Sequence, residues 1–217
     1  MHEGLNQLES RADLIERLQK SMVRINVLRN SPSVPVGGES LSLRIEKVPN
    51  GSGFFVDKDL IITSRHVVGS HRTPVTVDVY GEDGPLSVSD EASVVYVDPI
   101  LDIALIKTRT AIEDVTQLGD SDKIRIGDDV LVLGSPLRGK SHVSRGIISG
   151  FNGSLMTTDV SLHGGHSGGP MVSEDTGEVV GVNTAIVLGN GTGAIGHAIP
   201  INDVKKLLKE LSVEKKF

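Results

Sequence analysis

The chain has 217 residues, of which 38% are hydrophobic and 23% charged, and 28 acidic residues against 22 basic ones give a net charge of −6. This composition is typical of a folded globular protein and argues against a disordered chain or a membrane protein. The acidic balance and the scarcity of aromatic residues, with no tryptophan, two tyrosines and four phenylalanines, argue against nucleic acid as a partner.

The absence of cysteine excludes disulfides, thiolate catalysis and cysteine-based zinc sites. No stretch approaches the roughly 18 consecutive apolar residues of a membrane span, so no membrane partner is expected. The first residues, MHEGLNQLESRADL, lack the apolar core of a signal peptide. We therefore expect a cytoplasmic protein, or a periplasmic or secreted one if a leader has been removed.

Helical periodicity marks the two ends of the chain. In the N-terminal segment, 1–22, apolar residues recur every three or four positions and predict an amphipathic helix; they are Leu8, Ala12, Ile15, Leu18 and Met22. In the C-terminal segment, 201–217, Asn202 can cap a second helix. One face of that helix would carry Val204, Leu207, Leu208 and Leu211.

Between these segments the hydrophobic pattern has a period of two, which predicts β-strands. The clearest are VRINVL (23–28), LSLRIE (41–46), VTVDVY (75–80), DIALIK (102–107), VLVLG (130–134), VSRGIIS (143–149) and EVVGVNT (178–184). About a dozen short strands with glycine and proline turns predict an all-β sandwich or barrels. Segment 111–128 is the candidate linker between two β-halves, 23–110 and 129–200, and NSPSVPVGGES (30–40) is a predicted surface loop.

The stretch GGHSGGP (164–170) places Ser167 in a glycine-rich loop. Such a loop can serve only to supply turns with positive φ angles. It can also bring bare N–H groups within reach of a developing negative charge beside a nucleophilic serine. A serine hydroxyl needs a base and a group that orients the base, so the choice depends on partners elsewhere in the chain.

His66 and Asp102 are the candidate partners of Ser167. His66 follows a predicted hairpin, GFFV–DKD–LIIT, which ends abruptly at Ser64 and Arg65; the alternative is a solvated loop histidine. Asp102 opens the apolar strand DIALIK, where a half-buried carboxylate would need a partner; the alternative is a capping aspartate that faces water.

The order of these residues along the chain discriminates between folds that share the G-x-S-x-G motif. In α/β-hydrolases the acid and the histidine follow the serine, whereas here His66 and Asp102 precede Ser167. The order histidine, aspartate, serine is that of chymotrypsin-type enzymes. The first two residues fall in one β-half and the serine in the other, which predicts a site in the cleft between the halves.

The chain resembles the trypsin-like serine proteases, and most closely the protease domain of the HtrA (Deg) family. GSGFFVDKDLIITSRHVV resembles the histidine block of that family, LDIALIK its aspartate block, GGHSGGPMVSEDTGEVVGVNTAI its serine block, and AIGHAIPIND its last strand and final helix. The resemblance implies two six-stranded Greek-key β-barrels of the chymotrypsin type, with an N-terminal and a C-terminal helix. It does not extend to a PDZ module, and His166 stands where the family commonly has asparagine.

The resemblance also implies roles for individual residues. Ser167 would be the nucleophile, His66 the base and Asp102 the group that orients it. The N–H groups of Gly165 and Ser167 would form the oxyanion hole, and Thr184 would support the aspartate. The expected substrate-binding residues are Leu162, Ala185, Ile186, Val187, Gly196 and His197, which predict a small apolar pocket; His197 alone could instead favour an acidic side chain.

We therefore expect a serine endopeptidase that cleaves unfolded or exposed polypeptides, in protein quality control, without a metal or cofactor. The alternative is a catalytically silent protease-like module that binds hydrophobic peptides as a chaperone or scaffold. His163 and His166 are three residues apart but have no third ligand at a fixed nearby spacing, so no metal site is expected. By resemblance, the N-terminal segment could hold a homotrimer together; alternatively it packs on its own barrel.

Overall fold

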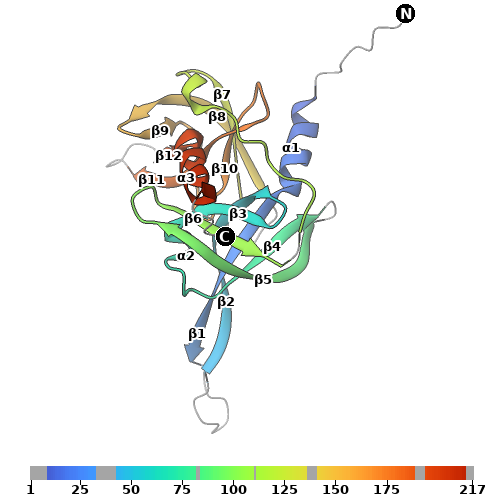
Figure 1. Cartoon of the computed structure of the whole chain (residues 1–217). Coiled ribbons are helices and arrows are strands. Elements are labelled where there is room, and N and C mark those ends of the chain that lie inside the picture. The colour runs from blue at the N-terminus through green and yellow to red at the C-terminus, as the bar shows by residue number, and fades with distance from the viewer. Residues whose placement is uncertain are drawn as a thin grey trace, which may run out of the picture.

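Two closed antiparallel β-barrels make up most of the protein (Figure 1). The computed structural model describes residues 9–32, 43–81, 84–109, 111–135, 141–188 and 194–213. Each barrel has six strands, and the strands follow one another around the barrels in the orders β1-β2-β3-β6-β5-β4 and β10-β11-β12-β9-β8-β7. The all-β fold with two six-stranded barrels and terminal helices, which the resemblance implied, is confirmed. The predicted loop at 30–40 lies largely outside the described residues.

The first barrel is built from β1 (Met22–Pro32), β2 (Leu43–Asp57), β3 (Leu60–Ser64), β4 (Val75–Gly81), β5 (Gly84–Asp98) and β6 (Ile103–Thr108). β1 and β2 pair along the whole of β1, whereas β4 pairs with β1 only over 23–27. The outer half of the β1–β2 hairpin therefore extends beyond the barrel as a two-stranded ribbon, visible at the bottom of Figure 1.

The second barrel is built from β7 (Asp129–Gly134), β8 (His142–Asn152), β9 (Leu155–Thr158), β10 (Pro170–Ser173), β11 (Val179–Leu188) and β12 (Ala194–Pro200). β10 pairs with β11 only as far as residue 182, while β12 pairs with β11 over 181–188. In the described part of the chain, the far end of β11 thus has a strand partner on one side only.

In the described part of the chain, four helical segments join and cover the barrels: α1 (Arg11–Lys20), α2 (Arg65–Val68), the 3-10 turn η1 (Ser121–Lys123) and α3 (Ile201–Val213). Ser10 caps α1 in a capping box with Asp13. Leu14 and Leu18 of α1 are buried, and Arg11 forms an ion pair with Glu174 after β10. The apolar face of α1 is therefore used within its own chain, and any assembly through this segment would have to use other residues.

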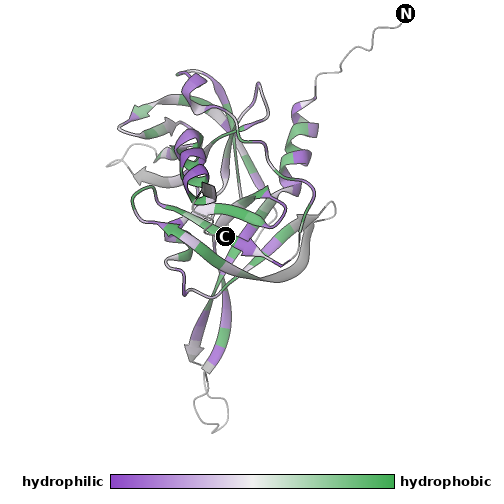
Figure 2. Cartoon of the chain, viewed as in Figure 1, coloured by the Kyte–Doolittle hydropathy of each residue, from purple (hydrophilic) through white to green (hydrophobic). Residues whose placement is uncertain are grey.

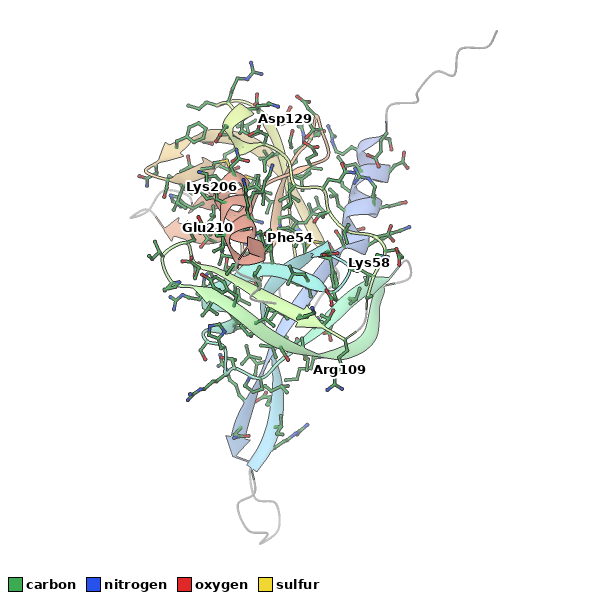
Figure 3. All side chains as sticks on the ribbon, viewed as in Figure 1. Phe54, Lys58, Arg109, Asp129, Lys206 and Glu210 are labelled. Carbon is green, nitrogen blue, oxygen red and sulfur yellow. The ribbon has the colours of Figure 1, made fainter. Side chains whose placement is uncertain are left out.

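Among the residues that the structure describes, three hydrophobic clusters form the core. One fills the first barrel and includes Ile25 and Val77, and one fills the second barrel and includes Val132 and Met171. The third combines residues of both barrels with α1 and α3, including Phe54, which lies at the centre of Figure 3. Figure 2 shows hydrophobic and hydrophilic residues alternating along strands of both barrels. The barrels are thus fused through a common core.

The connection between the barrels is tied to both of them. The Thr116 hydroxyl donates to the Phe55 carbonyl of the first barrel at 2.7 Å. Gly119 and Val179 of the second barrel are joined by a backbone hydrogen bond of 2.9 Å. Asn202 of α3 donates to Asp120 at 2.8 Å. No helix in the described part of the chain is both long and apolar enough to cross a membrane.

Candidate active site

The predicted catalytic residues reach the same region from separate elements of the two barrels. His66 lies in α2, directly after β3, and Asp102 lies in the turn before β6. Ser167 lies in the loop between β9 and β10 of the second barrel, and Thr184 lies in β11. Hydrogen bonds connect Asp102 to both His66 and Thr184. The site is therefore formed across the junction of the barrels.

Asp102 holds the His66 side chain and backbone at the same time. Its Oδ2 lies 2.6 Å from His66 Nδ1, and its Oδ1 accepts the His66 backbone N–H at 3.0 Å. This arrangement fixes the orientation of the imidazole and keeps the proton on Nδ1, so that Nε2 is the nitrogen available as a base. The His66 side chain is 43% exposed, which leaves it accessible to a substrate.

The backbone at Asp102 adopts an unusual conformation that directs this carboxylate. Its φ is 57°, in the left-handed region, which aspartate tolerates better than most residues. The Asp102 carbonyl accepts the Arg65 N–H at 2.8 Å, and the Arg65 Nε lies 3.8 Å from Oδ1. The sharp turn therefore brings the main chain and the side chain of Asp102 to the start of α2.

The pKa of the Asp102 carboxyl lies below its ordinary value. Partial burial acts to raise this pKa, but hydrogen bonds from His66 and Thr184 outweigh it. The Thr184 hydroxyl donates to Oδ2 at 2.7 Å. Asp102 is therefore ionised at neutral pH and can stabilise a protonated imidazole.

The Ser167 hydroxyl is hydrogen-bonded to a carbonyl rather than to the predicted base. Its Oγ donates to the Thr184 carbonyl at 3.2 Å, and no hydrogen bond joins it to His66 among the described residues. Catalytic hydrogen bonds are often formed only when substrate is bound, and a rotation about the Ser167 Cα–Cβ bond would redirect the hydroxyl. Ser167 is half-buried, so its side chain is partly accessible to solvent.

The predicted oxyanion donors are free of competing acceptors in the described part of the chain. Neither the Gly165 N–H nor the Ser167 N–H donates to another atom there. Gly165 has a φ of 105°, a conformation that suits glycine. These two N–H groups are therefore available to an anion beside Ser167.

Ser52 is a contact residue of the site that sequence reasoning missed. Its hydroxyl donates to the Gly165 carbonyl at 2.6 Å, and its N–H donates to the Ser167 carbonyl at 2.9 Å. The sequence offered one signal, the G-S-G triplet at 51–53 that opens the histidine block. That signal did not reveal the contact, because Ser52 and Ser167 belong to different barrels.

Three histidine rings lie close together: His163 and His166 belong to the loop between β9 and β10 that carries Ser167, the serine loop, and His142 belongs to β8. The ring centroids of His142, His163 and His166 lie 5.5–6.5 Å apart. Sequence reasoning missed His142 because it is contributed by another strand, β8. Burial, followed by the nearby rings of His142 and His163, lowers the pKa of His166 despite its hydrogen bond to the His163 carbonyl. Among the described residues, no group of three or more potential ligands could hold a metal ion.

The predicted specificity residues divide between two faces of β12. A Cβ atom at Gly196 would lie only 2.8 Å from Leu162 Cδ1, so the Leu162 side chain covers this backbone. His197 is also buried, but alternation along the strand directs it to the opposite face, which argues against a place in the same pocket. The side chains of Ala185, Ile186 and Val187 lie outside the described residues; their backbone belongs to β11.

A cleft of about 350 Å³ adjoins the loop that carries Ser167. It is lined by Val48, Pro49, Asn50, Gly51, Ser135, Gly164 and Gly165. The lining is contributed by both barrels and contains backbone polar groups of Gly164 and Gly165. An extended chain that passes Ser167 could therefore continue into this cleft.

Comparison with known proteins places the chain in a family. Residues 51–182 match the family model of the trypsin-like peptidase domain. The serine protease Do-like HtrB of Bacillus subtilis (strain 168) is 31% identical over 92% of this chain and 46% of the relative. The mitochondrial serine protease HTRA2 of Bos taurus is 35% identical over 91% of this chain and 42% of the relative. The chain thus spans about half the length of these relatives.

Solved structures show the same similarity. The HtrA-type protease AlgW with decapeptide has a TM-score of 0.77 and 26% sequence identity, over 93% of this chain and 67% of that one. Its S227A variant, also with decapeptide, has a TM-score of 0.74 at the same identity. The similarity of the two-barrel fold and the similarity of the sequence therefore indicate the same family.

Proposed function

Because the chain belongs to the trypsin-like peptidase family, among the HtrA-type serine proteases, we propose that it is a serine endopeptidase that uses Ser167, His66 and Asp102. The observation that supports this most strongly is the set of hydrogen bonds on Asp102. A carboxylate that accepts from Nδ1 and N–H of His66 and from Thr184 orients the imidazole as acyl transfer requires. A solvated loop histidine would not need two hydrogen bonds to one carboxylate that Thr184 also holds in place.

In the proposed reaction, His66 Nε2 takes the proton of the Ser167 hydroxyl as Oγ attacks the peptide carbonyl. The carbonyl oxygen becomes negative and accepts hydrogen bonds from the N–H groups of Gly165 and Ser167. His66 then gives its proton to the leaving amine, and an acyl-enzyme remains on Ser167. Water deprotonated by His66 attacks this ester and releases the second product.

We propose unfolded or exposed polypeptides as substrates. Within the described residues, the end of β11 has a free edge next to Thr184. An extended peptide could add to this edge as a strand, and such binding depends on main-chain hydrogen bonds more than on the peptide sequence. Leu162 packs against the Gly196 backbone, and we propose that its apolar side chain contacts the residue before the cleaved bond. The structural neighbour AlgW was solved with a decapeptide, which supports a polypeptide as substrate. A role in protein quality control would follow from such permissive binding.

One observation favours a second candidate function, a silent module that binds hydrophobic peptides. The Ser167 hydroxyl is engaged by the Thr184 carbonyl and not by His66. If no ligand can redirect this hydroxyl, the protein would bind peptides without cleaving them. The two candidates differ in whether Ser167 is ever acylated.

A fluorophosphonate probe and a casein substrate test the proposal. Wild type should be labelled and should cleave casein, whereas Ser167→Ala and His66→Ala should each abolish both signals. The double variant should lose nothing further, because the groups act as a unit. His71→Asn, a change of an exposed histidine close to α2, is the matched control and should behave as wild type. Absence of labelling in wild type, with and without added peptides, would establish the silent module instead.

A further inference from the structure

Ser52 connects the two barrels directly at the serine loop. It lies in β2 of the first barrel and is fully buried. Its neighbours Gly51 and Gly53 permit a close approach: a Cβ at Gly51 would lie 2.9 Å from the Ser167 carbonyl oxygen, and one at Gly53 would lie 2.9 Å from the Ile62 carbonyl oxygen. The backbone around Ser52 is therefore held tightly between its own barrel and the loop that carries Ser167.

Every polar atom of Ser52 has a hydrogen-bond partner. Its Oγ donates to the Gly165 carbonyl at 2.6 Å and accepts the Ser135 N–H at 2.8 Å. Its N–H donates to the Ser167 carbonyl at 2.9 Å, and its carbonyl accepts the Thr63 hydroxyl at 2.7 Å. A hydroxyl has one proton to donate, and Ser52 uses it on Gly165.

These contacts fall on the two residues whose N–H groups are proposed to bind the oxyanion. Gly165 follows another glycine, and a Cβ at Gly164 would meet nothing within 4 Å, so Gly164 has open space where a side chain would stand. The Ser52 hydroxyl holds the next peptide plane through the Gly165 carbonyl. A glycine pair without such an anchor can rotate its N–H away at little steric cost.

We propose that Ser52 is a positioning residue that keeps the Gly165 and Ser167 N–H groups directed at the developing oxyanion. This inference rests on the proposed function, because it assigns a cause to the geometry of that same site. Ser52 touches neither the substrate nor the reacting atoms. Its effect is transmitted through the carbonyl groups of Gly165 and Ser167, and it makes the oxyanion hole of the second barrel depend on the first.

The test compares Ser52→Ala and Ser52→Cys with Ser21→Ala. Ser21 is also fully buried, and its hydroxyl donates to the Leu18 carbonyl at 2.8 Å, so this control loses the same kind of bond away from the site. Removing one oxyanion donor lowers kcat by about 100- to 1000-fold. Because Ser52→Ala only loosens the donors, we expect kcat to fall by about 10- to 100-fold, with KM nearly unchanged and with an intermediate loss for Ser52→Cys.

Two further measurements separate positioning from a general loss of stability. A peptide aldehyde, whose adduct with Ser167 carries an oxyanion, should bind Ser52→Ala more weakly by the same factor as kcat falls. An uncleaved peptide should bind Ser167→Ala and Ser52→Ala/Ser167→Ala with equal affinity. If Ser52→Ala keeps wild-type kcat and aldehyde affinity while its stability falls as in Ser21→Ala, Ser52 is a structural contact only and the proposal is wrong.

An amide spectrum makes the test independent of turnover. The ¹⁵N–¹H signals of Gly165 and Ser167 should shift or broaden in Ser52→Ala and stay unchanged in Ser21→Ala. An inactive wild type would contradict the proposed function, but altered amide signals in Ser52→Ala would still support the positioning of the loop. Unchanged amide signals of Gly165 and Ser167 in Ser52→Ala would overturn the positioning role of Ser52, whether or not the wild type is active.

Discussion

Thr184 contributes to the site with both its side chain and its backbone. Its hydroxyl donates to Asp102 Oδ2 at 2.7 Å, and its carbonyl accepts the Ser167 hydroxyl at 3.2 Å. The first contact stabilises the carboxylate that orients His66, and the second competes with His66 for the serine proton. The two contacts therefore act in opposite directions on the nucleophile, and only the first can be removed by changing the side chain.

Thr184→Val removes the hydroxyl while keeping the shape of the side chain. A hydrogen bond to a charged group contributes about 1.5–3 kcal/mol, so a tenfold or greater loss of kcat/KM is expected at neutral pH. The pKa of Asp102 should rise, because one of the hydrogen bonds that lower it is lost. Thr184→Ser keeps the donor and should retain most of the activity. Peptide hydrolysis by the two variants measures the effect, and equal activity of Thr184→Val and wild type would show that the hydroxyl is dispensable.

His166 should make the stability of the fold depend on pH. Its pKa is lowered in the folded protein, first by burial, whereas in the unfolded chain it has the ordinary value of about 6.5. Below that pH the unfolded chain binds the proton more readily, so the free energy of unfolding falls as pH decreases, by at most about 1.4 kcal/mol per pH unit for one group. Above about pH 6.5 His166 is neutral in both states, and this loss of stability is absent.

Urea denaturation at several pH values between about 5 and 8, which spans the titration of histidine, tests this expectation. As the pH decreases, the free energy of unfolding of His166→Asn should fall less steeply than that of wild type. This holds whatever the stability of the variant at neutral pH. His71→Asn, a change of an exposed histidine, is the control for the substitution itself. Identical slopes for wild type and His166→Asn would show that His166 is protonated as easily in the folded state as in the unfolded one.

At the scale of elements, the loop between β9 and β10 depends on glycine for close packing as well as for its turns. Gly168 has a φ of 83°, and a Cβ there would lie 2.2 Å from Thr63 Oγ1 and 2.3 Å from the Ser52 carbonyl oxygen. Gly153, in the turn between β8 and β9, has a φ of 61°, but a Cβ there would meet nothing within 4 Å. The two positions share the backbone conformation and differ in the space around it.

Alanine at these two positions therefore separates backbone strain from overlap. Gly153→Ala should lower the free energy of unfolding by about 1–2 kcal/mol, the cost of a left-handed conformation with a side chain. Gly168→Ala should cost this amount plus about 1–3 kcal/mol for forcing the barrels apart. Thermal or urea denaturation gives both values. Equal losses would mean that the serine loop can move away from Thr63 and Ser52 without cost.

Sequence reasoning predicted the elements better than the contacts between them. Alternating residues such as those of 130–134 identify strands, and the order of His66, Asp102 and Ser167 predicts a candidate site between the barrels. The short helix α2 was not predicted, since four residues carry no helical period. Ser52 and His142 were missed because their roles arise from the neighbouring barrel and the neighbouring strand. Periodicity reports which face of a strand is buried, and not what that face contacts.

At the scale of the whole molecule, the shared core and the site link the two barrels. Phe54 and Leu105 of the first barrel belong to the same cluster as Leu131 and Val182 of the second. Hydrogen bonds cross the same junction from Ser52 to the serine loop, and from Ser64 to the Asn183 carbonyl at 3.1 Å. A site formed from both barrels requires that they keep their relative position, and a common core provides this.

The barrels should therefore unfold together, and a substitution inside one should weaken the other. Val77 is fully buried in the cluster of the first barrel, and Val132 in that of the second. Val77→Ala should lower the free energy of unfolding by roughly 2–3 kcal/mol through lost apolar contacts and the cavity. In a single cooperative unit this loss appears in the hydrogen exchange of core amides in both barrels, here Leu105 in β6 and Met171 in β10. Val132→Ala provides the reciprocal measurement. If each variant lowers protection only in its own barrel, the junction is a docking surface between two independent folding units, and the site between them would then be lost on their separation, before either barrel unfolds.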